Sequence, residues 1–196
     1  MKKNNEMFKN IRIAFAMLVF MTIVTGIFYP LVITGLAQLL YPVKANGSMI
    51  VENKKVIGSE LIGQNFVSTR YFWGRPSAIN NYPMPSGGSN LNPVGENFKT
   101  QFQARVDSIR KYKKNIELND IPKDLLFSSA SGVDHEISSA AAFFQIDRIA
   151  EARNFNENQK SKLIDAVKKA IQYPTFYILG EERVNVLKLN RMLDKL

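Results

Sequence analysis

The amino-acid sequence predicts an α+β protein: one N-terminal transmembrane helix followed by a single extracytoplasmic mixed α/β domain. Three observations lead to this prediction. Residues 13–43 contain no charged side chain, whereas a membrane-spanning helix needs only about 20 apolar residues. The following residues, 46–196, have ordinary apolar content and no repeat or low-complexity tract. Within them, predicted helices and a few short strands alternate in mixed order, which favours the α+β class.

The residues before the apolar stretch predict its orientation. Residues 1–12 form a short basic tail in which one acid, Glu6, accompanies four cations: Lys2, Lys3, Lys9 and Arg12. Because flanking positive charge is retained in the cytoplasm, we expect the N-terminus to be cytoplasmic. The domain of residues 46–196 would then be periplasmic or extracellular, on a single-pass protein of the plasma (inner) membrane.

The transmembrane helix is expected over residues 13–40, with its core at about 13–34. A cleavable signal peptide is the alternative, because Val43-Lys44-Ala45 has short side chains at positions −3 and −1 of a cleavage site. Signal peptides, however, have apolar regions of only about 7–15 residues. An uncleaved signal anchor is therefore favoured.

One face of this helix is predicted to contact a partner helix. Small or compact side chains recur every four residues at Thr22, Gly26, Pro30 and Thr34. Such a face lets a second helix approach closely in lipid, although small residues are also common in spans that have no partner. Pro30 leaves the carbonyl of Gly26 without its helical donor, which permits a kink.

The first part of the domain is predicted to be a hairpin, a long loop and a helix. Residues 48–51 and 55–58 flank the polar 52–54, as in a short hairpin. Residues 63–93 are rich in loop-forming residues. Asn92 and Pro93 suit the N-cap and first position of a helix. The buried face of that helix would contain four apolar residues: Phe98, Phe102, Val106 and Ile109.

The second part is predicted to hold further helices and short strands. Residues 119–122 break the chain, and short strands are expected at 125–127, 176–179 and 184–186. A helix from about Ser138 to Arg153 would bury Ala142, Ile146 and Ile149. Asn156 and Gln159 resemble a capping box for a helix that buries Leu163, Ile164, Val167 and Ile171. Tyr173-Pro174 would end this helix, and a final helix would present Leu189, Leu193 and Leu196.

The composition argues against several classes of function. The chain has no cysteine and only one histidine, His135, so a thiolate or multi-histidine metal site is excluded. Asp134 and Glu136 flank this histidine, but side chains of sequence neighbours usually point apart. Ser131 follows other serines without a G-x-S-x-G motif. We therefore expect no catalytic residue and no metal site. The net charge of +9 is spread along the chain without a basic arm, so we expect no nucleic acid as a partner; the apolar stretch implies membrane lipid.

A glycine-rich stretch is the candidate nucleotide contact. Adjacent glycines allow backbone N–H groups to converge on an anion, and neighbouring hydroxyls add donors; the residues concerned are Ser86, Gly87, Gly88 and Ser89. The stretch lacks the lysine of a P-loop and is bracketed by prolines, so a turn between packed segments is the alternative. Arg75 would pair with a carboxylate or hold its own loop by hydrogen bonds to carbonyls. We expect Arg75 and Asn90 either to contact a partner at the surface of the domain or to have a structural role within it.

Several strings, in order and over nearly the whole chain, resemble the C subunit of the bacterial Kdp potassium-transporting P-type ATPase. The strings are residues 25–26, 29–30, 45–48, 58–66, 71–78, 86–91, 131–134, 146–150 and 184–190. The resemblance implies a complex with a channel-like A subunit, a B subunit that hydrolyses ATP, and a small F peptide in some species. It implies that this chain is needed for assembly and activity, as a catalytic chaperone that raises the ATP affinity of the B subunit.

The resemblance also implies that the chain has no cofactor of its own, since the partner subunits handle ATP and potassium. In agreement, the phosphorylation string Asp-Lys-Thr-Gly-Thr of P-type pumps is absent. One departure is visible: where many relatives read Gly-Leu-Asp-Pro-His-Ile-Ser, His135 stands at the proline position and Glu136 at the histidine position. A role of that family histidine therefore does not transfer. The alternative function is a membrane-anchored extracytoplasmic nucleotide-binding module or hydrolase.

Overall fold

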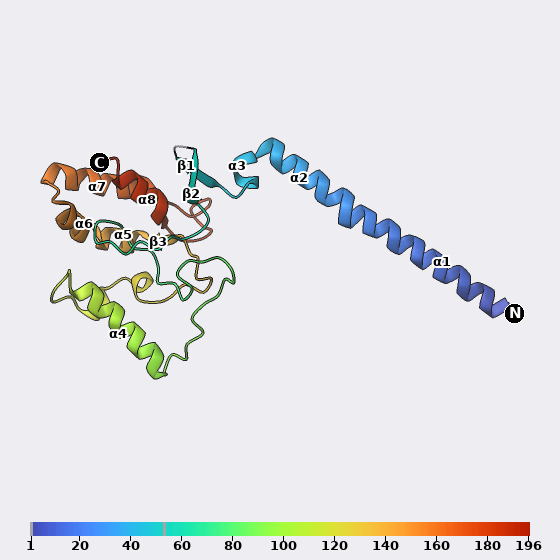
Figure 1. Ribbon diagram of the computed structural model, residues 1–196, viewed down its shortest axis with the longest axis horizontal. Helices are drawn as coiled ribbons and strands as arrows, with labels where there is room; N and C mark the ends of the chain where they lie inside the picture. Colours follow the sequence, from blue (N-terminus) through green and yellow to red (C-terminus); the bar gives the residue numbers. More distant parts are fainter. Residues whose placement is uncertain (1, 53) are drawn as a thin grey trace. The chain divides into compact units, whose positions relative to one another are not determined.

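A long helical segment forms the N-terminal part of the computed structural model, which describes residues 2–52 and 54–196 (Figure 1). It consists of α1 (Lys2–Ile23), a π-helical turn η1 (Val24–Phe28) and α2 (Tyr29–Leu40), followed by the short α3 (Pro42–Ala45). The chain divides into two compact units between Met49 and Ile50. An apolar N-terminal helix and a mixed α/β unit with small sheets confirm the predicted fold class.

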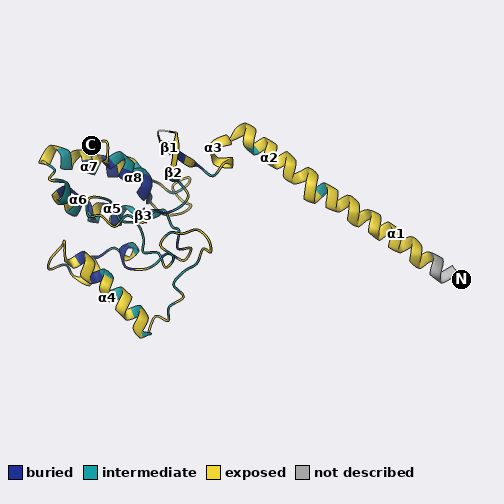
Figure 2. Cartoon of the chain, viewed as in Figure 1, coloured by how far each residue is buried: buried dark blue, intermediate teal, exposed yellow. Residues whose placement is uncertain are grey.

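The N-terminal helix is long and apolar enough to cross a membrane between Glu6 and Leu40, a stretch of 35 residues. At 1.5 Å per residue it measures about 52 Å, which exceeds the hydrocarbon thickness of about 30 Å. Nearly all of its described side chains are exposed (Figure 2). A helix with apolar side chains on every side needs an apolar environment around it, so this segment is a candidate membrane span.

The π-helical turn follows from Pro30. Proline has no N–H to offer the preceding turn, and the chain widens just ahead of it. The N–H of Tyr29 donates to the carbonyl of Val24, five residues earlier, and the hydroxyl of Thr25 donates to the carbonyl of Met21 at 2.7 Å. The missing donor at Pro30 is thus accommodated within the helix by one wider turn.

The second unit begins with the predicted hairpin. Strands β1 (Met49–Glu52) and β2 (Lys55–Ser59) form a two-stranded sheet, within one residue of the prediction. Asn53, between the two strands in sequence, lies outside the described residues. The side chain of Ile50 is buried, whereas Val51 and Val56 are exposed.

The second unit contains a three-stranded antiparallel sheet with the strand order β3-β5-β4, of which β3 is labelled in Figure 1. Its strands are β3 (Glu136–Ser138), β4 (Ile171–Gln172) and β5 (Arg183–Asn185). Val184 of the middle strand pairs with Ile137 on one side and Ile171 on the other. Because Val184 is fully buried, the sheet belongs to the core.

Helices supply most of the core around this sheet. They are α4 (Glu96–Arg110), α5 (Ser139–Phe144), α6 (Ile146–Arg153), α7 (Glu157–Ala170) and α8 (Val186–Leu193). Helix α7 packs against α6 and α8. The side chains with no exposed surface include Phe72, Ile149, Leu163, Val167, Leu189 and Leu193. The buried positions predicted on α5 and α6, namely Ala142, Ile146 and Ile149, are confirmed.

Local hydrogen bonds confirm the capping box and correct one helix start. Asn156 accepts from the N–H of Gln159, whose side chain accepts from the N–H of Asn156. Asn92 as an N-cap is wrong: α4 begins at Glu96 after Gly95, and Asn92 Oδ1 accepts from Val94 N–H in a turn. Because of this turn, the helix starts at Glu96 and not directly after Asn92.

Two predicted strands are wrong. Residues 125–127 end a 3₁₀-helical turn, η3 (Lys123–Leu125), because the N–H of Leu126 bonds to the carbonyl of Lys123. Residues 176–179 form a tight turn closed by a bridge between Thr175 and Leu179. The predicted helix over 138–153 is interrupted at Gln145, which separates α5 from α6. Finally, Leu196 lies beyond the end of α8 and is 39% exposed.

Candidate functional site

Two buried side-chain amides hold the loop 71–73 against the helices. Asn190 of α8 accepts from Phe72 N–H at 2.8 Å and donates to the Phe72 carbonyl at 3.0 Å. Gln145 accepts from Trp73 N–H at 2.8 Å and donates to the Trp73 carbonyl at 3.1 Å. Both amides are 2% exposed. They satisfy the backbone N–H and carbonyl groups of Phe72 and Trp73, which in a regular sheet would bond to a neighbouring strand. We call this arrangement the amide clamp.

Arg148 completes the clamp. Its guanidinium lies 3.8 Å from the centre of the Trp73 ring and donates to the carbonyls of Thr69 (2.5 Å) and Tyr71 (2.9 Å). Burial lowers its pKa to about 10, with an opposing effect from Tyr112. The group therefore remains a cation at neutral pH, and it binds the aromatic face and the carbonyl dipoles together.

The sequence interpretation missed Gln145, Arg148 and Asn190, although two of them leave a signal. Asn190 lies on the apolar face of α8 together with Val186, Leu189 and Leu193, at helical spacing, and Gln145 follows Ala142 by three residues. A single amide on an otherwise apolar helix face indicates a buried polar partner. The partners are 72 and 118 residues away in sequence, so the residues next to Gln145 and Asn190 do not identify them.

The structure places Arg75 on the same long loop, just after Trp73. Arg75 Nη1 lies 3.0 Å from Asp134 Oδ2, and both side chains are about a quarter to a third exposed, at 30% and 27%. Asp134 also accepts from Glu136 N–H at 3.0 Å. Arg75 Nε is buried and, among the described residues, has no hydrogen-bond partner. The ion pair thus connects the long loop to the segment that enters β3.

The predicted glycine-rich stretch packs on the same segment. Gly87 N–H donates to the carbonyl of Ser131 at 2.9 Å, and a Cβ on Gly88 would lie 3.0 Å from the carbonyl oxygen of Ala130. Ser86 is exposed, whereas Gly87, Gly88 and Ser89 are half-buried. Asn90 is exposed and has a left-handed backbone, with φ of 48°. In this arrangement the Gly87 N–H already has a protein acceptor.

Gly132 shows how closely these two loops meet. Its φ is +72°, a region that favours glycine, and a Cβ would lie 2.5 Å from the Gly87 carbonyl oxygen and 2.6 Å from Ile79 Cγ1. Ser77 Oγ donates to the Gly132 carbonyl at 2.5 Å and accepts from the N–H groups of Ile79 and Asn81. A single hydroxyl therefore organises one loop while bonding to the other.

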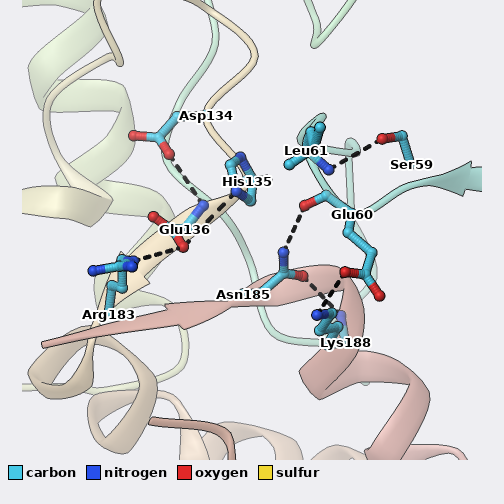
Figure 3. A network of polar contacts seen from close by, with 9 residues as sticks. All are labelled: Ser59, Glu60, Leu61, Asp134, His135, Glu136, Arg183, Asn185 and Lys188. Carbon is cyan, nitrogen blue, oxygen red and sulfur yellow. Dashed lines mark hydrogen bonds and ion pairs between the residues drawn. The ribbon is translucent and has the colours of Figure 1, made fainter. Parts of the chain in front are cut away.

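His135 and its neighbours belong to a polar network that joins three segments (Figure 3). Asp134 faces Arg75, whereas Glu136 Oε1 accepts from Arg183 Nε at 3.0 Å and lies 3.8 Å from His135 Nε2. Across β5, Asn185 donates to the carbonyl of Glu60 at 2.8 Å, and Lys188 Nζ lies 2.7 Å from Glu60 Oε2. The network ties 59–61 to β3, β5 and α8.

In the cavity beside Arg75, both arginines already bond to other residues of the domain. A cavity of about 180 Å³ is lined by Arg75, Arg105, Asn80 and Asn81, among others. Arg105 donates to the Leu126 carbonyl at 2.7 Å and to Ser128 Oγ at 2.8 Å, and burial lowers its pKa. Within residues 2–52 and 54–196, no group of three His, Cys, Asp or Glu side chains is placed to hold a metal ion.

The helix face predicted to meet a partner is changed by the π turn. In an α-helix each residue advances by about 100°, so Thr22 and Thr34 would lie about 120° apart. A π turn accommodates one additional residue, which reduces that angle to about 20°. Thr22, Gly26, Pro30 and Thr34 are all exposed in the unit, and they form a nearly straight stripe.

Comparisons with known proteins agree along the chain. Residues 11–195 match the family described as K⁺-transporting ATPase, c chain. A protein of Burkholderia orbicola named potassium-transporting ATPase KdpC subunit is 45% identical over 189 residues, covering 94% of this chain and 95% of its own. Proteins with the same name are 42% identical in Photorhabdus laumondii (95% and 96% covered) and 43% identical in Paraburkholderia phytofirmans (97% of each).

These matches extend over both units, from the apolar helix to α8, and include the amide clamp, the Arg75 loop and the glycine-rich stretch. The chain belongs to the KdpC family, the c chains of K⁺-transporting ATPases.

Proposed function

We propose that the chain is the accessory C subunit of a high-affinity, ATP-driven potassium uptake complex and does not hydrolyse ATP itself. The observation that carries this proposal is the family match over residues 11–195, with relatives named as subunits of a potassium-transporting ATPase. The partners would be the channel-like A subunit, the ATP-hydrolysing B subunit and, in some species, the small F peptide. ATP and potassium would be handled by these partners.

The two units suit an anchor and a rigid accessory domain. The candidate span would hold the chain in the membrane with the basic tail in the cytoplasm, as flanking cations favour. The second unit would then lie outside, where its loops are fixed by the amide clamp and by ion pairs such as Arg75–Asp134. We infer that this domain covers the outer mouth of the channel-like subunit while the helix joins the A and B subunits.

The stripe formed by Thr22, Gly26, Pro30 and Thr34 is the proposed contact for a partner helix. Small side chains let two helices approach closely enough for backbone packing in lipid. A Cβ on Gly26 would meet only Thr22 Cγ2, at 4.0 Å. A larger residue at this position therefore leaves the helix itself intact and fills the space that a partner would occupy.

Purification of the tagged chain from membranes tests both the complex and the stripe. The A and B subunits are expected to co-purify with the wild-type chain, and Gly26→Leu is expected to reduce their recovery at least about tenfold, the effect of about 1.4 kcal/mol. Gly35→Leu is the matched control, since a Cβ there meets nothing within 4 Å and lies about 100° from Thr34. Equal losses in both variants, or none in either, would contradict the proposed stripe.

A catalytic-chaperone role would require coupling across the membrane. ATP is cytoplasmic, and only the basic tail of this chain would lie there in the proposed orientation. An effect on ATP affinity would therefore be carried by the partner subunits as a coupling free energy between distant sites. Its test is the affinity of the B subunit for a non-hydrolysable ATP analogue, which is expected to fall when this chain is removed. An unchanged value would contradict the chaperone role.

Direct nucleotide contact by Ser86, Gly87, Gly88 and Ser89 stays a separate hypothesis. The Gly87 N–H bond to Ser131 favours a packing role for the stretch. Binding of ATP to the purified full chain at micromolar concentration, lost on replacement of Ser86 and Ser89 by alanine, would favour the nucleotide-binding alternative. Photocrosslinking from Ser86 to outer loops of the A subunit would favour the interface.

A further inference from the structure

The loop between β4 and β5 exposes a cluster of large apolar side chains. Phe176, Tyr177 and Ile178 are 82%, 83% and 80% exposed, and Tyr173 and Leu179 are 55% and 63% exposed. We call residues 173–179 the apolar tip. Single exposed apolar residues are ordinary, but several contiguous large ones mark a surface that meets a partner or a membrane.

Four backbone N–H groups of the apolar tip, those of Thr175, Tyr177, Ile178 and Leu179, donate within the tip itself. Thr175 and Leu179 exchange two N–H to carbonyl bonds, each of 3.0 Å. Between them, Tyr177 N–H donates to Pro174 and Ile178 N–H donates to Thr175, at 2.9 and 3.2 Å. A lipid environment offers no hydrogen bonds, so each unpaired N–H that enters it is costly. A protein partner could satisfy such groups, whereas entry into lipid requires that they be satisfied beforehand.

The chain between the two units keeps the second unit near the bilayer. The candidate span ends at Leu40 and the second unit begins at Ile50. Ten residues reach at most about 36 Å when fully extended, and the helical α3 shortens this reach. The second unit is therefore held at high effective concentration next to the membrane surface.

The residue types of the apolar tip fit the membrane interface. Tyrosine has an apolar ring and a polar hydroxyl, and it is enriched where headgroups meet acyl chains. The tyrosine rings at 173 and 177 lie 6.2 Å apart. Charged residues bound the tip at Lys169 and Glu181, and they would stay in the headgroup region. In residues 46–196 Lys and Arg outnumber Asp and Glu, which also attracts the second unit to anionic lipid.

We propose that the apolar tip inserts its aromatic and aliphatic side chains into the interfacial layer of the bilayer that holds the chain. The insertion gives the domain a second membrane contact besides the helix, and so restricts its orientation over the membrane. This inference rests on the proposed membrane anchoring by Glu6–Leu40.

A single labelled cysteine tests the insertion, because the chain has no cysteine of its own. Tyr177→Cys in the full chain is labelled with an environment-sensitive fluorophore and reconstituted, without other subunits, in nanodiscs of phosphatidylcholine and phosphatidylglycerol. We expect a blue-shifted emission that is quenched by lipid-attached quenchers and protected from aqueous iodide. Lys162→Cys, at an exposed position on α7, is the control and should behave oppositely.

The possible outcomes separate the two proposals. If the chain incorporates into nanodiscs but both labels stay accessible to iodide, insertion of the apolar tip is wrong while the anchor stands. If the Tyr177 label becomes protected only after addition of the A and B subunits, the tip binds protein and the lipid proposal is likewise overturned. A chain that does not incorporate overturns both proposals. Unchanged Trp73 fluorescence in both variants verifies that the fold is retained.

Discussion

Replacing Asn190 by leucine should lower the free energy of unfolding by about 4 kcal/mol. The change removes both hydrogen bonds to Phe72, whose side chain has no exposed surface, and leaves its N–H and carbonyl without their partners. Each buried unsatisfied group costs about 1–3 kcal/mol, so the two together cost about 2–6 kcal/mol. A total stability of about 5–15 kcal/mol would be reduced by a large fraction.

The fluorescence of Trp73 provides the assay. It is the only tryptophan in the chain and lies within the amide clamp, so thermal unfolding of the full chain in detergent can be followed at the relevant place. For a unit of this size, 1 kcal/mol shifts the midpoint by about 2–4 °C. The expected decrease is therefore about 8–16 °C.

Asn97→Leu is the matched control, because Asn97 is exposed on α4 and surface changes usually remain within about 0.5 kcal/mol. A midpoint for Asn190→Leu within about 2 °C of this control would refute the reasoning. In that case water or loop movement would satisfy the Phe72 backbone, and the clamp would contribute little to stability.

Two further predictions concern the loop contact and one ion pair. Gly132→Ala should destabilise the chain by about 2–4 kcal/mol, because the added Cβ overpacks against Gly87 and Ile79 at a positive φ. Gly87→Ala is the control and should be neutral in the same thermal melts, since no atom lies within 4 Å of its added Cβ. Equal effects of the two variants would disprove the steric reasoning. The hydrogen bond from Lys160 to Asp147 (2.8 Å) raises the pKa of Lys160 above its ordinary 10.5. Because the folded-state pKa is the higher one, the small contribution of this exposed pair is complete below pH 10.5 and is lost as pH rises through the folded-state pKa. NMR titration of the lysine signals should show a lower pKa in Asp147→Asn, and an unchanged value would exclude the pairing.

Features encoded by nearby residues could be predicted from the sequence. The apolar helix, the first hairpin and the Asn156–Gln159 capping box depend on contacts within a few residues, so the local pattern contains both partners. The family resemblance was also readable, because its strings run along the chain. The strand predicted at 176–179 failed for a physical reason. Its residues have high β-propensity, but that propensity reflects packing against neighbouring strands, and here Thr175 and Leu179 bond to each other instead.

The amide clamp depended on tertiary structure alone. In the sequence, Asn190 and Gln145 indicate only that a buried polar partner exists. Phe72 and Trp73 become those partners because the long loop crosses α8 and the α5–α6 junction. The contact between Gly87 and Gly132 is of the same kind. Hydrogen bonds between segments so far apart depend on the path of the whole chain. The sequence by itself determined the candidate membrane span, the fold class and the family. The tertiary structure decided how the loops are held and which surface, the apolar tip, stays exposed.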